Sequence, residues 1–396
     1  MIMRKSYVLM FLCFLLVVSG CSVSTTDYSD VPDQLKQDKN EIEFKPLVIN
    51  NKEELETQIE KAVNGFTEEF SFSGAVYVGV GELDIFSKGV GFADYEEQID
   101  NTVDTKFLIG KGTTEFTAAA ILMLEDEGYL YLDDPITEYF PEHTHWEEVT
   151  IEHLLSMSSG IVNYMEEPYF SQIPEWVYTT TDEGKDLDVI MGIFENEELN
   201  FIPGEEFEYS FSNYILLGRI IEQVTGMPFH EYIKENIFNP LEMTNSGLGN
   251  NWIDEYDKAI GYSMIGQGYA DEMELYNTGG VDASAGLYST VNDLSKWYKA
   301  INTNEILSKE VVQKMFTTHT SIENKPNNIN EFNYGLGTYL YGNVAVNINR
   351  MLGYTSLVHY EPETGVLIII LGNHERIFYT NNSLKNILLE VIYGRS

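Results

Sequence analysis

The feature that most constrains the fold is a pair of strand-like runs near each end of the chain. Near the N-terminus, Gly74–Val80 is separated by a turn at Gly81-Glu82 from a second run, Ile85–Phe92, which is a β-hairpin pattern. Near the C-terminus, Ser356–Tyr360 and Val366–Leu371 form a similar pair of runs. We therefore predict one antiparallel sheet that is built from both ends of the chain.

The segment between the two strand pairs, roughly 110–300, carries mainly helical patterns. Phe116–Leu124 is apolar nearly all round, which is typical of a buried helix, and Tyr214–Val224 is a second apolar helix. Amphipathic helices are predicted outside the strand pairs, over Lys52–Gly65 and Ser383–Tyr393. The expected fold class is α/β: an antiparallel sheet flanked by helices, with a sheet lobe at about 51–109 and 303–396 and a large helical insertion lobe at about 110–302.

The first fifty residues form a targeting segment and a linker. Arg4 and Lys5 precede an apolar run, Tyr7–Val18, that is too short to span a bilayer comfortably. The run ends in Val18-Ser19-Gly20-Cys21, which resembles a bacterial lipobox. The resemblance implies a lipoprotein signal peptide at 1–20, a lipid on Cys21, a flexible tether over 21–50 and one folded domain over 51–396. An ordinary signal peptide followed by a chance cysteine is the alternative.

We therefore expect an extracytoplasmic protein, anchored to the membrane of a Gram-positive bacterium through the lipid on Cys21. The only other cysteine is Cys13, inside the removed segment, so no internal disulfide is expected. The chain has 23 basic and 63 acidic residues and a net charge of −40. Such a charge repels phosphate and argues against nucleic acid as a partner. It is explained by solubility outside the cell or, alternatively, by attraction of cationic peptides.

Many short strings along residues 65–390 resemble the serine β-lactamase and penicillin-binding protein superfamily, in its class C β-lactamase, esterase and D-aminopeptidase branch. They occur in the order found in that family. The resemblance implies the β-lactamase/transpeptidase-like fold. The strings include Phe72-Ser73-Gly74-Ala75-Val76, Asp104 to Gly110, Phe116 to Ile121, Leu132-Asp133-Asp134-Pro135, Thr150 to Leu155, Ser159-Gly160-Ile161, Pro240 to Thr244 and Gly286 to Thr290.

The first catalytic cluster implied by the resemblance is Ser-x-x-Lys at the start of the central helix, where the serine is acylated and the lysine helps to move its proton. In register with Phe107-Leu108-Ile109-Gly110, the serine position is Lys111 and the lysine position is Thr114. Both residues are changed. A lysine that attacked an acyl donor would form an amide, which does not hydrolyse at a useful rate, so turnover would stop.

The second and third implied clusters are changed as well. In the Tyr-x-Asn cluster, Tyr209 is kept but Phe211 stands at the asparagine position and offers no hydrogen bond. The third cluster is Lys-Thr-Gly or His-x-Gly on the strand that lines the site. Neither string precedes Gly353-Tyr354-Thr355-Ser356, and Arg350 is the nearest cation. The candidate cleft residues are thus Lys111, Thr114, Tyr209, Phe211 and Arg350.

We expect from these losses a non-catalytic homologue that binds a cell-envelope peptide or protein, with a role in wall regulation or in immunity to a peptide. The alternative is an active esterase, D-peptidase or β-lactamase-like hydrolase with a relocated nucleophile. Thr113 is one candidate but should point elsewhere on the helix. Ser156, Ser158 and Ser159 are expected to pack and cap. No cofactor is expected, and His143 with His145 is too weak a pattern to predict a metal site.

Overall fold

The computed structural model describes residues 47–174, 185–248, 257–264, 270–272, 282–321, 333–375 and 378–394. The predicted signal peptide, the predicted lipidation site Cys21 and nearly all of the predicted tether lie outside these residues. Among the described residues, no helix is both long and apolar enough to cross a membrane.

Both ends of the chain contribute strands to one sheet, as the sequence predicts. β1 pairs antiparallel with β15, so that Ala75 lies opposite Leu371 and Val80 opposite Val366. Every neighbouring pair of strands in this sheet is antiparallel. The eight strands lie side by side in the order β10 (Thr320–Ser321), β11 (Asn333–Tyr334), β12 (Tyr339–Tyr341), β13 (Val344–Met351), β14 (Tyr354–Tyr360), β15 (Val366–Gly372), β1 (Gly74–Val80) and β2 (Leu83–Val90).

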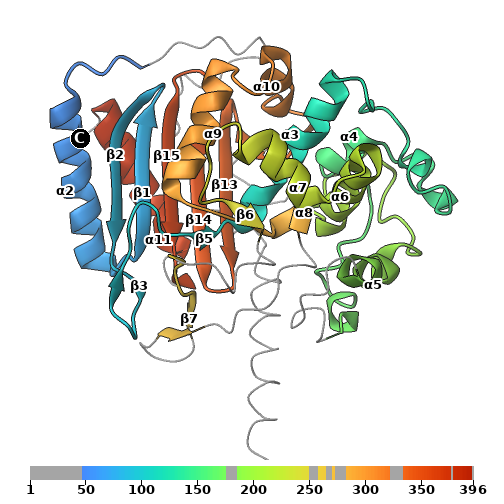
Figure 1. The fold of residues 1–396 in the computed structure, drawn as a ribbon, viewed down its shortest axis with the longest axis horizontal. Coiled ribbons are helices and arrows are strands. Elements are labelled where there is room, and N and C mark those ends of the chain that lie inside the picture. The colour runs from blue at the N-terminus through green and yellow to red at the C-terminus, as the bar shows by residue number, and fades with distance from the viewer. Residues whose placement is uncertain are drawn as a thin grey trace, which may run out of the picture.

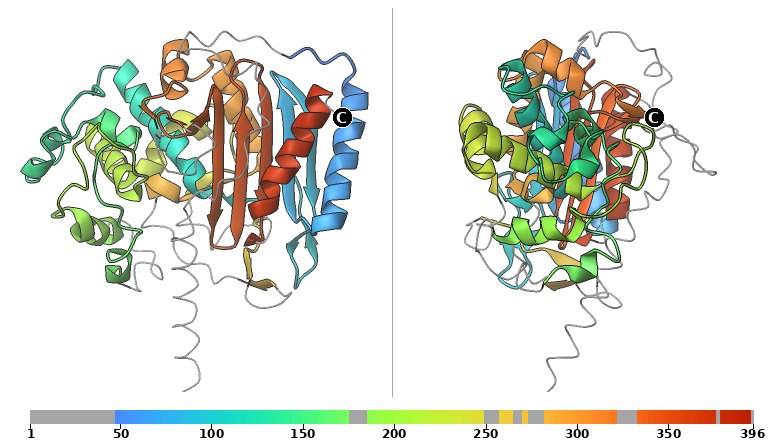
Figure 2. Two further views of the ribbon diagram at one scale, coloured as in Figure 1. Left: turned by 180° about the vertical axis from the view of Figure 1, so that it is seen from behind. Right: turned by 90° about the vertical axis from the view of Figure 1, so that its right-hand side faces the viewer.

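One face of the sheet is covered by the two helices that flank the strand pairs in the sequence, α2 (Lys52–Phe70) and α11 (Phe378–Tyr393) (Figure 2). Leu55, Ile59 and Val63 recur every four residues along α2, and all three are buried against the sheet in a core shared with α11. The Asn51 side chain accepts a hydrogen bond from the N–H of Glu54 and so caps the start of α2.

The other face of the sheet packs against α9 (Val291–Thr303) and the helical lobe (Figure 1). At the centre of this larger core is α3 (Thr113–Asp126), in which even the polar residues of the first turn are buried. Next to it runs α6 (Phe211–Thr225), which ends at Gly226 in the left-handed conformation. The remaining helices are α4 (Ile151–Leu155), α5 (Lys185–Phe194), α7 (Phe229–Ile233), α8 (Asp282–Ala285) and α10 (Lys309–Met315).

Short strands and single helical turns complete the fold. The run predicted over Ile85–Phe92 divides into two strands, because Gly91 turns the chain with a φ of +66°. The short strands are β3 (Phe92–Asp94), β4 (Ile99–Asp100), β5 (Phe107–Leu108), β6 (Gly247–Leu248), β7 (Tyr262–Met264), β8 (Ala270–Glu272) and β9 (Leu287–Ser289). The single turns are η2 (Gly110–Gly112), η3 (Ile136–Glu138), η4 (Thr144–Trp146), η5 (Phe170–Gln172) and the π-helical η7 (Lys234–Phe238).

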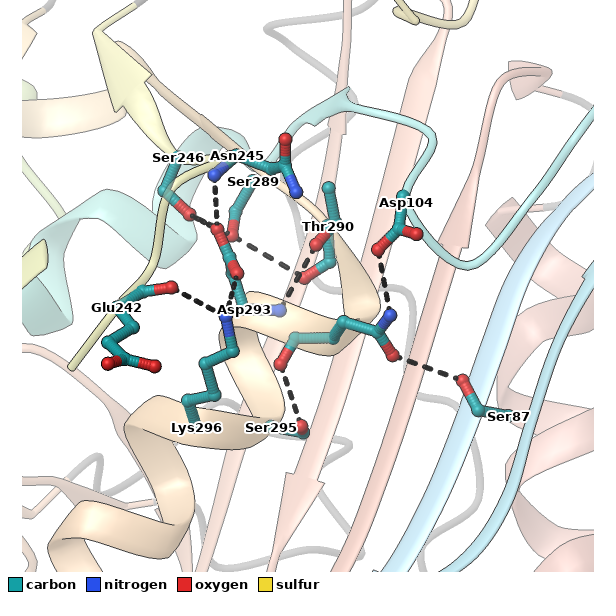
Figure 3. Close-up of polar contacts among 11 residues, drawn as sticks. Ser87, Asp104, Glu242, Asn245, Ser246, Ser289, Thr290, Asp293, Ser295 and Lys296 are labelled. Atoms are coloured by element: carbon teal, nitrogen blue, oxygen red, sulfur yellow. Dashed lines mark hydrogen bonds and ion pairs between the residues drawn. The ribbon is translucent and has the colours of Figure 1, made fainter.

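A buried carboxylate ties the start of α9 to the segment before β6 (Figure 3). Asp293 is fully buried, and its Oδ2 accepts hydrogen bonds from the N–H of Asn245 at 2.7 Å and from Ser246 Oγ at 3.0 Å. Its Oδ1 accepts from Lys296 Nζ at 2.8 Å, and the same ammonium donates to the carbonyl of Glu242. Both carboxylate oxygens of Asp293 thus accept hydrogen bonds from nearby main-chain and side-chain donors. This cluster therefore has a structural role, because it holds the start of α9 against the segment before β6.

Candidate functional site

The site is built around η2, the turn that leads into α3 and carries Lys111. Gly110 in this turn has a φ of +53°, a conformation that favours glycine. A Cβ at Gly110 would lie 1.9 Å from Nδ2 of Asn349, so this strand side chain packs directly on the turn. Ser356 Oγ donates a hydrogen bond to the carbonyl of Ile109 at 3.0 Å. The turn is thus fixed against β13 and β14, which sets where Lys111 emerges.

An aromatic wall, defined as Tyr209, Phe211 and Tyr339, faces this turn. The ammonium of Lys111 lies 4.1 Å from the centroid of the Tyr209 ring and 5.7 Å from that of Phe211. Tyr209 stacks on Tyr339 with the centroids 6.2 Å apart and the planes at 8°. Asn163 Oδ1 accepts the N–H of Phe211 at 3.2 Å and positions the start of α6. Lys111, Tyr209 and Phe211, distant in the sequence, therefore converge on one cation–π cluster.

The two hydroxyls nearest Lys111 in the sequence are buried and bonded to the main chain. Thr114 is 2% exposed, and its Oγ1 lies 2.7 Å from the carbonyls of both Lys111 and Gly337. Thr113 is fully buried, and its Oγ1 accepts the N–H of Leu287 at 3.1 Å. Thr113 thus points away from the aromatic wall, in line with its position on the helix.

Comparison with known proteins identifies the scaffold around this cluster, because the family model described as Beta-lactamase matches residues 59–385. The chain belongs to the beta-lactamase family. It is 28% identical over 376 residues to the putative penicillin-binding protein PbpX of Bacillus subtilis. The aligned region covers 93% of this chain and 85% of PbpX. The expected fold and family resemblance are both confirmed.

Solved structures with a similar fold were found as well. The octameric penicillin-binding protein homologue from Pyrococcus abyssi has a TM-score of 0.73 and 27% identity, over 86% of this chain and 78% of its own. D-amino acid amidase from Ochrobactrum anthropi also has a TM-score of 0.73, over 87% of this chain and 100% of its own. Its identity of 23% shows a shared fold and no more.

The serines that follow α4 pack as small polar groups, as expected for this family. Ser156 Oγ donates to the carbonyl of Glu152 at 2.7 Å and lies 2.9 Å from Ser158 Oγ. Ser159 Oγ donates to Oδ1 of Asn213 on α6 at 2.7 Å. All three serines are at most 3% exposed, so they join α4 to its neighbours rather than line an accessible surface.

The strand position of Arg350 sets it apart from the other predicted cleft residues. Side chains alternate along a strand, and the odd positions of β13 face the helical lobe: Asn347 bonds to α3, and Asn349 packs on Gly110. Ile348, at an even position, packs in the core beneath α2 and α11. Arg350 shares that even parity and is placed on the face opposite the aromatic wall. The sequence prediction rests on the charge of Arg350 and on its nearness to Gly353-Tyr354-Thr355-Ser356, and it does not take the parity of the strand into account.

A buried carboxylate beside the site was missed in the sequence. Glu115 follows Thr114 directly and is 1% exposed. Its Oε1 accepts from Trp297 Nε1 at 2.9 Å, and its Oε2 accepts from Tyr298 Oη at 2.9 Å and from Asn347 Nδ2 at 2.7 Å. Glu115 thus joins α3, α9 and β13 behind the turn that carries Lys111. A single acid in the first turn of an otherwise apolar helix was the signal that could have indicated it.

Burial raises the pKa of Glu115 to about 7, although the three hydrogen bonds act in the opposite direction. Because the carboxyl is enclosed by the core, ionising it places a charge among α3, α9 and β13 that only the three hydrogen bonds stabilise.

The histidine pair considered as a metal site lies in the helical lobe. His143 Nε2 is 3.6 Å from Glu142 and 3.7 Å from Glu195, and its ring lies 5.9 Å from that of His145. Within the described part of the chain, no group of three or more histidine, cysteine, aspartate or glutamate side chains is arranged to hold a metal ion.

Proposed function

We propose that this chain is a lipid-anchored, non-catalytic member of the beta-lactamase family that binds a cell-envelope peptide or protein. The observation that carries the proposal is the placement of the Lys111 ammonium on the ring of Tyr209, 4.1 Å from its centroid. The family resemblance puts an acylatable serine at this position. An ammonium held over an aromatic face is a poor nucleophile, and its acylated product is a stable amide.

The neighbouring hydroxyls support the same conclusion. Thr113 and Thr114 are buried, and each is engaged by main-chain groups, so neither offers an oxygen to an incoming carbonyl. Phe211 supplies an apolar edge where the family resemblance implies a hydrogen-bonding asparagine. Losing both a nucleophile and the residue that activates it removes several powers of ten of rate enhancement in serine hydrolases.

A binding role is supported by what the site contains. Lys111 supplies a positive charge, and the aromatic wall of Tyr209, Phe211 and Tyr339 supplies apolar surface and stacking. Asn349, on the strand beside the turn, has a buried Nδ2 with no hydrogen-bond acceptor among the residues that the structure describes. Peptides combine backbone carbonyls and amides with apolar side chains, and they are the ligands that such a surface fits best.

The first experiment tests for acylation. Purified protein incubated with a fluorescent penicillin is expected to show no covalent labelling, and p-nitrophenyl esters and D-alanyl peptides should not turn over. Covalent labelling that disappears on Lys111→Ala or Thr113→Ala would overturn the proposal in favour of a hydrolase with a relocated nucleophile. A triple variant, Lys111→Ser with Thr114→Lys and Phe211→Asn, restores residues of the first two implied clusters. Covalent labelling of this variant, without labelling of the wild type, would support loss of catalysis through these substitutions.

The second experiment tests the anchor and location. We expect the protein to fractionate with the membrane when expressed in a Gram-positive bacterium and to resist extraction by high salt. Cys21→Ala should release it, since the net charge of −40 gives no attraction to anionic lipid heads. Membrane retention of the Cys21→Ala variant would contradict lipid anchoring.

A further inference from the structure

A cavity of about 290 Å³ lies in the helical lobe, between the segment that contains η4 and the segment that precedes Tyr209. None of the residues that line it belongs to the aromatic wall or to the Lys111 turn. The lobe projects on the side of the molecule opposite α2 (Figure 1). The lining combines three polar residues, His145, Glu148 and Glu198, with the apolar Leu199, Phe201, Ile202 and Pro203.

Both walls of this cavity are held by main-chain hydrogen bonds. On one side, the N–H of Asn200 donates to the carbonyl of Gly160 at 2.7 Å, and that of Gly204 donates to Ser158 at 2.8 Å. On the other side, Trp146 is fully buried, and its carbonyl accepts the N–H of Val149 at 2.9 Å. These bonds fix the main chain next to the lining residues on both sides of the cavity.

The charge of the cavity is negative and uncompensated by the described residues. Glu148 and Glu198 are exposed, and neither forms an ion pair with any residue in the described part of the chain. His145 is the only lining residue that can carry a positive charge. The apolar part is partly open, since Ile202 is 58% exposed. The cavity thus offers two carboxylates beside an apolar surface.

We propose that this cavity binds a basic side chain of a peptide, a lysine or arginine next to an apolar residue. The two carboxylates complement the ammonium or guanidinium group, and Leu199, Phe201 and Ile202 contact the apolar neighbour. A cavity of about 290 Å³ is at the small end of ligand pockets, so it accommodates one or two side chains. The net charge of −40 also draws cationic peptides toward the surface. This site is separate from the cleft in the proposed function.

The probe is N-acetyl-leucyl-lysine amide, which has one positive charge and one apolar side chain, and ligand-observed NMR measures its dissociation constant. The double variant Glu148→Gln with Glu198→Gln is expected to bind about tenfold more weakly. The matched control, Glu147→Gln with Glu206→Gln, removes the same charge from exposed positions that do not line the cavity and should leave the affinity unchanged. Ile202→Ser should also weaken binding of the probe. It should change the salt dependence of the dissociation constant less than the variant Glu148→Gln with Glu198→Gln does.

Three results would overturn this site. If both double variants bound the probe equally more weakly than the wild type, the overall charge of the protein would attract the probe and no defined pocket would be involved. Equal affinity for the uncharged N-acetyl-leucyl-glutamine amide would show that the carboxylates do not recognise the cation. Loss of binding in Lys111→Ala would place the probe in the cleft. The penicillin assay does not depend on these residues, so failure of this site and failure of the non-catalytic proposal are distinguishable.

Discussion

Replacing Glu115 by glutamine should flatten the pH dependence of stability. The carboxyl is 1% exposed, and burial raises its pKa from an ordinary 4.5 to about 7. Between these two values the folded protein binds more protons at this position than the unfolded chain does. Raising the pH therefore favours unfolding, so the stability that Glu115 contributes is complete below pH 4.5 and is lost as the pH rises through 7.

The magnitude follows from the separation of the two pKa values. One pKa unit corresponds to about 1.4 kcal/mol, so the wild-type protein should lose about 3 kcal/mol of its unfolding free energy between pH 4 and pH 8 at this residue. Glutamine has nearly the same shape and does not titrate. Its amide cannot accept from all of Trp297, Tyr298 and Asn347 as the carboxylate does, so the variant also carries a penalty that is independent of pH.

The assay is urea unfolding of the wild type and of Glu115→Gln at intervals from pH 4 to pH 8. The difference in unfolding free energy between the two proteins should change by about 3 kcal/mol over this range, because all other titrating groups cancel in the comparison. Glu56→Gln, at an exposed position on α2, is the control and should run parallel to the wild type. Parallel curves for wild type and Glu115→Gln would refute a carboxyl that titrates inside the core.

Three further predictions concern the scaffold. Gly110→Ala should destabilise the fold by about 3 kcal/mol in urea unfolding, because of its φ of +53° and the contact with Asn349; a change below 1 kcal/mol would mean the turn is not fixed. Thr290→Ala removes the N-cap of α9 and should cost about 1 kcal/mol, whereas Thr290→Ser should recover most of it. Burial alone would raise the pKa of Glu361, but its hydrogen bonds hold that pKa below the usual value, so stability is lost as the pH falls through it. Tyr393→Phe removes one donor to Glu361 and should move the acid unfolding midpoint to higher pH; an unchanged midpoint would count against this role.

The overall fold could be predicted from local patterns because its elements are long and their periodicity is clear. The spacing of Leu55, Ile59 and Val63 predicted the buried face of α2, and the runs near both chain ends predicted the sheet. The family strings fixed a register that brought Lys111, Tyr209 and Phe211 together. These predictions depended on residue spacing within single elements and on short strings shared with the family. Both can be read from the sequence without knowledge of long-range contacts.

The cavity of the helical lobe and the buried network could not be predicted in the same way. Glu115 meets Trp297, Tyr298 and Asn347 only because α3, α9 and β13 pack together, and no local pattern encodes which donors surround it. Arg350 shows the same limit, since its charge is visible in the sequence whereas the face it occupies depends on the register of β13.

The sequence by itself determined the order of the elements, the negative charge and the replacement of a serine position by Lys111, because each follows from residue type and spacing along the chain. Only the tertiary structure decided that the Lys111 ammonium rests on Tyr209 and that Thr113 and Thr114 are turned to the main chain. It also decided that Arg350 shares the strand parity of Ile348, which faces the core beneath α2 and α11. The physical reason is that hydrogen bonds and ring contacts act over a few ångströms, between residues that the chain separates by dozens of positions.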